Sequence, residues 1–218
     1  MGHAGMAAAA VRYLGSAASP AVEALPRPQL RCVGEDERAP VGQEEFRRVL
    51  GTFASGVTVV TAPATDASPA PAGFVCQSFS SLSLDPPLVA FMVGRTSTTW
   101  PRIARAGVFC VNVLGARQGE LCRAFAVSGA SGADKFAGVA HDPAPATGSP
   151  RLAGTLAWID CAIHAVHTGG DHLIVVGRVQ ALGTGDGVQE GPLLFYRGRF
   201  GRLTERTTAH SDGRQPPQ

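Results

Sequence analysis

Residues 56–79 read GVTVVTAPATDASPAPAGFVCQSF, and this stretch decides the fold class. Valine and threonine dominate residues 56–63, and a second run with apolar residues resumes at 72–79 after a segment rich in proline and alanine. β-Branched residues bounded by proline are typical of strands. The stretch therefore predicts two strands joined by a loop.

The chain on the C-terminal side of this stretch predicts further strands. Residues 87–94 (PLVAFMVG) are almost all apolar, which is typical of a strand buried on both faces, and residues 108–114 (VFCVNVL) predict another strand. Two long strands are expected at 155–167 and 171–182, joined by a glycine-rich turn, and a last strand is expected at 193–200 (LLFYRGRF). The pattern gives about six or seven strands.

Short helices are expected beside these strands. The first begins near Gln43, where apolar residues recur at helical spacing after two glutamates, and others are expected at 97–106 and 116–127. Residues 128–151 are rich in glycine, alanine, serine and proline and predict a loop. The chain lacks a βαβ alternation, so the predicted class is mainly β. We expect a Greek-key barrel with a few short peripheral helices rather than a doubly wound sheet.

The composition predicts one folded domain with tails. Apolar residues make up 44% of the chain and charged residues 17%, which supplies enough apolar material for one core. Residues 1–41 lack a regular period and predict a disordered arm, residues 42–203 form the domain, and residues 204–218 predict a flexible tail. Residues 7–18 resemble the apolar part of a signal peptide but follow no basic residue, so a secretory signal is not expected.

Charge and cysteine content narrow the function classes. The net charge is +2 and basic runs with interleaved aromatic residues are absent, so binding to nucleic acid or to a membrane is not expected. The five cysteines include no C-x-x-C pair, which argues against a disulfide framework and a zinc site and favours reduced thiols in the cytoplasm. His164 and His167 lie on one predicted strand and point to opposite faces, so no metal site is expected.

Two polar segments are candidate binding sites for a nucleotide. Residues 76–87 (CQSFSSLSLDPP) place hydroxyl and amide groups between two apolar strands, where they could bind the edge of a planar ring; an ordinary serine-rich turn is the alternative. Arg95, Ser97, Thr98 and Thr99 precede or begin a predicted helix, a place that suits phosphate; a plain N-cap with a surface arginine is the alternative. The glycine fingerprints of Rossmann and P-loop folds are absent, so a nucleotide must bind in another way.

A histidine and an aromatic segment are further candidates. His172 follows Asp171 in a glycine-rich turn, which suits proton transfer or a hydrogen bond to an amide; a solvated surface histidine is the alternative. Residues 195–200 (FYRGRF) carry rings and arginines that can stack on nicotinamide or adenine; a strand with one buried ring and outward arginines is the alternative. Serine, histidine and cysteine residues show no order typical of a hydrolase.

Six segments of the chain, taken together, resemble the short-chain flavin reductase family: 46–62 (FRRVLGTFASGVTVVTA), 73–89 (GFVCQSFSSLSLDPPLV), 109–114 (FCVNVL), 134–138 (DKFAG), 169–172 (GGDH) and 193–200 (LLFYRGRF). The resemblance implies an FMN-binding split β-barrel that forms a homodimer with the flavin near the subunit interface. It also implies an enzyme that uses NADH or NADPH to supply reduced FMN or FAD to a separate flavin-dependent monooxygenase. The GF-x-CQSF variant resembles the reductases paired with phenol-ring and steroid-ring hydroxylases.

The resemblance implies roles for individual residues. The isoalloxazine ring is expected against Gly73, Phe74, Val75, Gln77 and Ser78, with Ser81 and Ser83 as weaker candidates. The ribityl phosphate is expected near Ser97, Thr98 and Thr99, and the segment that covers the flavin is expected to supply Arg123, Phe125, Lys135 and Phe136. The nicotinamide nucleotide is expected against His172, Tyr196 and Arg197. Many family members have asparagine and alanine where this chain has Gln77 and Cys76, so the resemblance leaves the amide geometry at the ring edge open.

The chemistry implied by the resemblance asks little of side chains. Hydride passes directly from nicotinamide C4 to flavin N5, so the protein stacks the rings, while backbone amides and Lys135 stabilise charge on the reduced flavin. Two alternatives fit the same barrel. One is a flavoprotein that holds FMN tightly and reduces another acceptor, and the other is a non-enzymatic module that binds flavin or haem.

Overall fold

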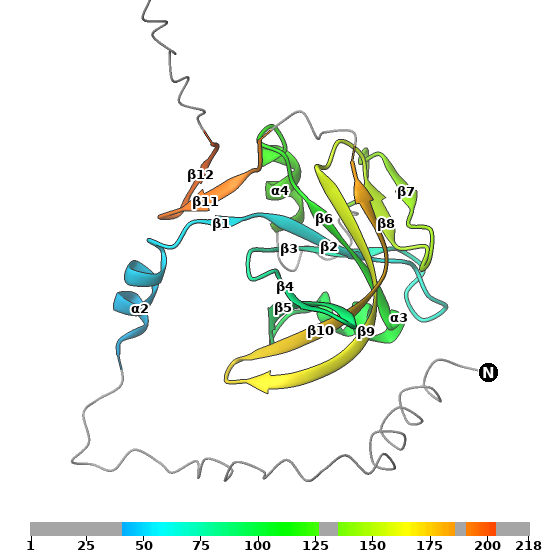
Figure 1. Cartoon of the computed structure of the whole chain (residues 1–218), viewed down its shortest axis with the longest axis horizontal. Coiled ribbons are helices and arrows are strands. Elements are labelled where there is room, and N and C mark those ends of the chain that lie inside the picture. Colours follow the sequence, from blue (N-terminus) through cyan, green and yellow to red (C-terminus); the bar gives the residue numbers. More distant parts are fainter. Residues whose placement is uncertain (1–40, 127–134, 186–190, 204–218) are drawn as a thin grey trace, which may run out of the picture.

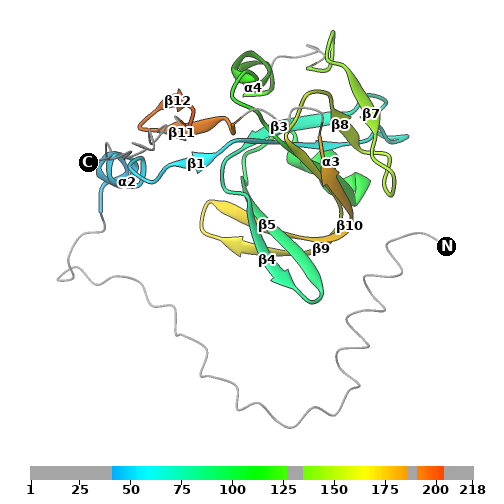
Figure 2. The same cartoon turned by 45° about the horizontal axis from the view of Figure 1, so that its top comes forward.

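The computed structural model describes residues 41–126, 135–185 and 191–203. Seven strands form one antiparallel sheet in the order β3-β2-β6-β9-β10-β5-β4. Their bounds are β2 (Thr58–Ala62), β3 (Ala72–Cys76), β4 (Ser80–Leu84), β5 (Pro87–Gly94), β6 (Val108–Val113), β9 (Ala157–Gly169) and β10 (His172–Thr184). The sheet curls so that β4 and β5 come round beneath β2 and β3 (Figure 2), which makes the barrel that the sequence predicts.

Two smaller sheets and three helices surround the barrel within the described residues. The first sheet has the order β1 (Ser55–Gly56), β11 (Leu194–Tyr196) and β12 (Arg199–Gly201), and the second pairs β7 (His141–Pro143) with β8 (Pro150–Leu152). The helices are α2 (Gln43–Leu50), α3 (Trp100–Ala106) and α4 (Gly119–Ala126). The predicted tail at 204–218 and residues 1–40 of the predicted arm lie outside the described residues.

Strand β2 is buried on both faces because two apolar clusters lie against it. Val60 belongs to the cluster inside the barrel, and its neighbour Val59 belongs to a second cluster beneath α4. Successive strand residues point to opposite faces, so an uninterrupted run of valine and threonine is what this position needs. Inside the barrel, the ring of Phe91 meets the ring of Phe109 edge-on at 5.2 Å between centroids.

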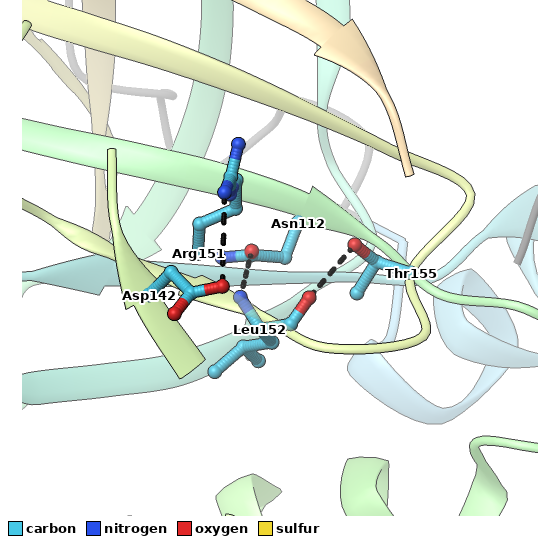
Figure 3. Close-up of polar contacts among 5 residues, drawn as sticks. All are labelled: Asn112, Asp142, Arg151, Leu152 and Thr155. Carbon is cyan, nitrogen blue, oxygen red and sulfur yellow. Dashed lines mark hydrogen bonds and ion pairs between the residues drawn. The ribbon is translucent and has the colours of Figure 1, made fainter. Parts of the chain in front are cut away.

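A polar side chain fastens β8 to the outside of the barrel (Figure 3). Asn112 on β6 is fully buried; its amide nitrogen lies 3.1 Å from the carbonyl oxygen of Val59, and its oxygen accepts a 2.8 Å hydrogen bond from the backbone of Leu152. Thr155 donates to the carbonyl of the same leucine at 3.0 Å. Because a buried unpaired amide is costly, these bonds fix where β8 lies.

Helix α2 projects from the barrel instead of covering it (Figure 1). The prediction of an amphipathic helix at this place is confirmed, but the apolar side chains have no partner in the described part of the chain and are exposed: Val41, Phe46, Val49, Leu50 and Phe53. Phe53 lies past the helix end and is 81% exposed. No helix among the described residues combines the length and apolar character needed to span a membrane.

Three segments differ from the sequence-based prediction. Residues 193–200 form a hairpin, β11 and β12, instead of one strand, because Arg197 and Gly198 take φ angles of 48° and 77° at the turn. The serine-rich segment after Cys76 contains the edge strand β4, and the predicted loop 128–151 contains β7 and the first two residues of β8. Residues 87–94 form a strand as predicted, but its faces alternate: Phe91 is buried and Met92 is exposed.

Candidate active site

A cavity of about 660 Å³ opens where the end of β3, the end of β5 and the start of β10 meet. Its wall is made by residues 74–78, 92–94, 96–99 and 125–126, together with Lys135 and His172. Small-molecule sites in proteins have volumes of about 300–1,000 Å³, so the cavity suits a nucleotide-sized ligand. It brings together segments that lie as much as 98 positions apart in the sequence, from Phe74 to His172.

Four of the polar side chains on the wall are free to bind a ligand. Within the described residues, the side chains of Gln77, Thr96, Thr98 and Thr99 have no hydrogen-bond partner, although all four line the cavity. Ser97 differs, because its hydroxyl oxygen accepts a 3.2 Å hydrogen bond from the backbone of Trp100 at the start of α3. The wall therefore presents one amide and three hydroxyl groups that can pair with a polar ring edge or a phosphate.

The hydroxyl of Ser78 is already used by the protein. It accepts a hydrogen bond from the backbone N–H of Met92 at 2.9 Å and donates to the carbonyl of Met92 at 3.0 Å. The thiol of Cys76 lies 3.4 Å from the same hydroxyl. Ser78 thus joins the end of β3 to β5 across the open edge of the barrel, and its only proton is not available to a ligand.

The remaining wall is apolar and suits a planar ring. Phe74 and Val75 come from β3, Met92 from β5, and Phe125 from α4. The Phe125 ring is fixed, since it packs edge-on against Phe136 at 5.0 Å between centroids. Apolar walls with a few free polar groups are typical of cofactor sites.

Lys135 supplies a cation at the cavity wall. Its ammonium donates to the carbonyl of Phe125 at 3.0 Å and, at a longer 3.4 Å, to that of Gly73. Burial, followed by the nearby charge of Arg102, lowers the pKa of Lys135 below its ordinary 10.5. The ammonium has three N–H donors, so one of them can still contact an anionic ligand.

His172 lies at the cavity mouth and is held by its neighbour. Its Nδ1 is 2.8 Å from a carboxylate oxygen of Asp171, and this hydrogen bond lowers the pKa of Asp171 below its ordinary value. The other ring nitrogen, Nε2, would lie 3.9 Å from a Cβ atom at Gly94, which is another wall residue. With Nδ1 occupied, Nε2 is the atom that can reach a ligand.

Three other predicted residues do not line the cavity. A Cβ on Gly73 would lie 2.7 Å from the Phe125 ring, so this glycine allows β3 to pack under α4. Phe136 is buried in the second apolar cluster. Arg123 is exposed and forms an ion pair with Glu120, and its guanidinium lies over the ring of Phe200 at 5.5 Å.

Tyr196 and Arg197 do not line the cavity of their own chain. They lie at the turn of the β11–β12 hairpin, where the backbone of Arg197 donates to the carbonyl of Gly51 at 2.9 Å, close to the end of α2. Ser81 and Ser83 lie on β4 and Arg95 precedes the wall segment, and none of the three lines the cavity.

The sequence prediction missed several wall residues. Thr96 lies inside the segment predicted to approach phosphate, between Arg95 and Ser97, but it was not itself named; its place in a hydroxyl-rich run was the signal. Met92 and Gly94 were hidden in an apolar run, which gives no sign of which residues face a cavity. In the described ranges, histidine, cysteine, aspartate and glutamate form no cluster of three that could hold a metal ion.

Comparison with known proteins gives a consistent set of matches. Residues 50–204 match the family described as flavin reductase like domain. The reductase subunit HsaB of a flavin-dependent monooxygenase from Rhodococcus jostii is 48% identical over 160 residues, which are 73% of this chain and 77% of the relative. An NADH-dependent FAD reductase from Streptomyces globisporus is 40% identical over 75% of this chain and 87% of its own.

Solved structures with the same fold include two close in sequence. Component B of a nitrilotriacetate monooxygenase from Mycobacterium thermoresistibile has a TM-score of 0.68 and 43% identity over 81% of this chain and 91% of its own. The NADH:FAD oxidoreductase SgcE6 from Streptomyces globisporus, in complex with NAD and FAD fragments, has a TM-score of 0.68 and 34% identity over 82% of this chain and 99% of its own.

Proposed function

The chain belongs to the flavin reductase-like domain family, and we propose that it is an NADH-dependent flavin reductase that supplies reduced flavin to a separate monooxygenase. The family that the six segments predicted is confirmed. Relatives named as an NADH-dependent FAD reductase and an FMN reductase (NADH) support NADH as the hydride donor and either flavin as acceptor. Relatives named as reductase components of monooxygenases support the partner.

The cavity is the observation that carries the proposal. Its apolar wall from Phe74, Val75, Met92 and Phe125 would hold the isoalloxazine ring, and the free amide of Gln77 would pair with the polar edge of that ring. The free hydroxyls of Thr96, Thr98 and Thr99 would approach the ribityl phosphate, together with the unused donor of Ser97. Lys135 would place positive charge beside the reduced, anionic ring.

The reaction needs alignment rather than acid–base groups. A bound flavin would supply a hydride acceptor, and the wall residues would hold its ring in line with the reduced nicotinamide. Two contacts hold the wall in place for this alignment. The Phe125 ring packs edge-on against Phe136, and the Ser78 hydroxyl binds both backbone groups of Met92. His172 would hold the nicotinamide at the mouth, with Asp171 setting the orientation of its ring.

Steady-state kinetics of His172→Ala test this assignment, with His167→Ala as the control. Both histidines are exposed on the β9–β10 hairpin, but only His172 lines the cavity. Loss of one polar contact should raise the KM for NADH about tenfold, while the flavin Kd changes by less than about twofold. Unchanged NADH kinetics in His172→Ala would remove this residue from the site.

A tightly held flavin that reduces another acceptor is the alternative function. The two differ in where the reduced flavin goes, since a reductase of a two-component system must release it. If stopped-flow mixing shows that reduced flavin leaves the protein during turnover, the alternative is excluded. Retention through many turnovers would favour it.

We also propose that the protein is a cytoplasmic homodimer. The exposed apolar residues of α2 form a patch that a single chain leaves uncovered, and such patches commonly mark subunit interfaces. The backbone of Arg197 is hydrogen-bonded to Gly51 at the end of α2, so a second copy that covers α2 would lie close to Tyr196 and Arg197. A nicotinamide site made by both subunits would explain why these two residues lie outside the cavity of their own chain.

Sedimentation velocity tests the dimer. The native protein should sediment as a dimer, Phe46→Asp should shift it towards monomer, and Gln43→Asp, a polar position on the same helix, should leave it dimeric. A native protein that is monomeric at micromolar concentration would contradict this arrangement.

A further inference from the structure

Met92 places a sulfur atom on the wall of the flavin cavity. Its side chain is 42% exposed, although it lies in the middle of an apolar strand. The other methionines of the sequence are Met1 and Met6, so Met92 is the only one in the folded domain. A thioether in contact with solvent is open to oxidation to the sulfoxide.

The backbone of Met92 is held in place, so its side chain cannot turn into the barrel core. Ser78 binds both its N–H, at 2.9 Å, and its carbonyl, at 3.0 Å. Its neighbours Phe91 and Val93 are buried in the barrel core, which fixes the alternation of the strand. Met92 therefore points away from the barrel core, and it lines the cavity.

The cysteine thiols of the described residues should react with an oxidant more slowly than the thioether of Met92. Cys76, Cys110, Cys122 and Cys161 are all buried, and burial raises the pKa of Cys76 and of Cys122 above the ordinary 9.0 and that of Cys110 to about 12. Peroxide reacts with thiolates rather than thiols, so these groups are slow targets. In this part of the chain, Met92 is the exposed sulfur.

We propose that Met92 is an oxidation site at which hydrogen peroxide derived from the enzyme's own product converts the thioether to a sulfoxide and weakens flavin binding. The inference rests on the proposed function, because reduced flavin is the source of the peroxide. When no monooxygenase consumes the anionic reduced flavin, dioxygen takes two electrons and one proton from it and a second proton from water, which gives oxidised flavin and hydrogen peroxide.

The sulfur step balances without a further reactant. The O–O bond of hydrogen peroxide breaks, an S–O bond forms on Met92, and the second oxygen leaves as water with both protons. The sulfur is oxidised by two electrons and the peroxide is reduced by two. Methionine sulfoxide reductases reverse the change, so the modification is reversible.

The sulfoxide changes the wall where a ring has to stack. It adds a strongly polar oxygen to a wall whose apolar part is made by Phe74, Val75 and Phe125, and a bound ring would remove water from that oxygen, which is costly. We expect the flavin Kd to rise about tenfold. Turnover without a monooxygenase to consume the reduced flavin would therefore slow, because the oxidised protein binds flavin more weakly. The rate would recover when the sulfoxide is reduced.

Treatment with hydrogen peroxide alone tests the site without any reliance on catalysis. Peptide mass spectrometry should find one added oxygen on Met92, no oxidation of the four buried cysteines, and a flavin Kd raised about tenfold, all in a Cys32→Ser background. Met92→Leu, compared with its own untreated Kd, should not respond to peroxide. Equal loss of flavin affinity in Met92→Leu, or an unchanged Kd after Met92 is oxidised, would overturn the proposal.

Turnover in air separates this inference from the proposed function. Native protein is incubated with NADH and FMN, with and without catalase, while NADH and peroxide are measured. Met92 sulfoxide should accumulate only without catalase. Absence of NADH oxidation would refute the proposed function, whereas NADH oxidation with peroxide build-up and an intact Met92 would refute the oxidation site.

Discussion

Gly94→Val should narrow the cavity at one side while leaving the barrel intact. A Cβ at position 94 would have only ordinary contacts, 3.9 Å from Nε2 of His172 and 3.9 Å from the hydroxyl of Thr96, and the backbone φ is not in the left-handed region. Valine is favoured in strands, whereas glycine in a strand costs about 0.5–1 kcal/mol relative to alanine. The free energy of unfolding should therefore stay equal or increase.

Ligand binding should respond in the opposite direction. The valine methyl groups would occupy space between His172 and Thr96, two wall residues of the cavity. Overpacking a filled site costs about 1–3 kcal/mol, which corresponds to a Kd or KM about 5 to 150 times higher. The flavin, the nicotinamide or both should bind more weakly by this factor.

Flavin fluorescence titration, NADH kinetics and thermal unfolding together measure these effects. Gly56→Val is the matched control, because Gly56 is also a strand glycine whose Cβ would meet no atom within 4 Å, and it lies outside the cavity. Gly56→Val should leave Kd and KM unchanged. Normal flavin and NADH binding in Gly94→Val, or unfolding of Gly94→Val alone, would refute the cavity assignment.

Two further predictions concern stability. Asn112→Ala should lower the free energy of unfolding by about 2–3 kcal/mol in urea denaturation, because the backbone N–H of Leu152 loses its buried acceptor; a loss below about 0.5 kcal/mol would show that this bond does not fix β8. The folded-state pKa of Lys135 lies below its unfolded value, so between the two the unfolded chain binds more protons and stability rises with pH. Lys135→Met should remove that rise in alkaline urea titrations, and an identical pH slope in the variant would contradict the depressed pKa.

The strands that were predicted well are those in which a run of apolar residues is bounded by turn residues such as proline and glycine. Residues 87–94 follow a proline turn and end at a glycine, and the observed strand has these bounds. The hairpin at 193–200 was missed because its turn places an arginine, Arg197, at a positive φ, which the sequence does not signal. Strand β4 was missed because alternating serine and leucine at an exposed edge resembles a loop.

The cavity was predicted in outline because its segments are locally polar, but the use of each side chain depends on tertiary contacts. Ser78 is on the wall as expected, yet its hydroxyl binds the backbone of Met92, 14 positions away. The resemblance predicted Gly73 and Phe136 against the flavin. In the structure both residues pack against the ring of Phe125. Met92 was missed because an apolar run does not reveal which of its residues face a cavity.

Anaerobic turnover followed by ultrafiltration tests the central claim most directly. The protein is mixed with NADH and an excess of FMN or FAD, and the filtrate is analysed for reduced flavin by its absorbance. We predict that NADH is oxidised in equal amount to the flavin reduced and that the reduced flavin appears in the filtrate. A protein that leaves NADH unoxidised with both flavins, or that keeps all reduced flavin above the filter, would contradict the account.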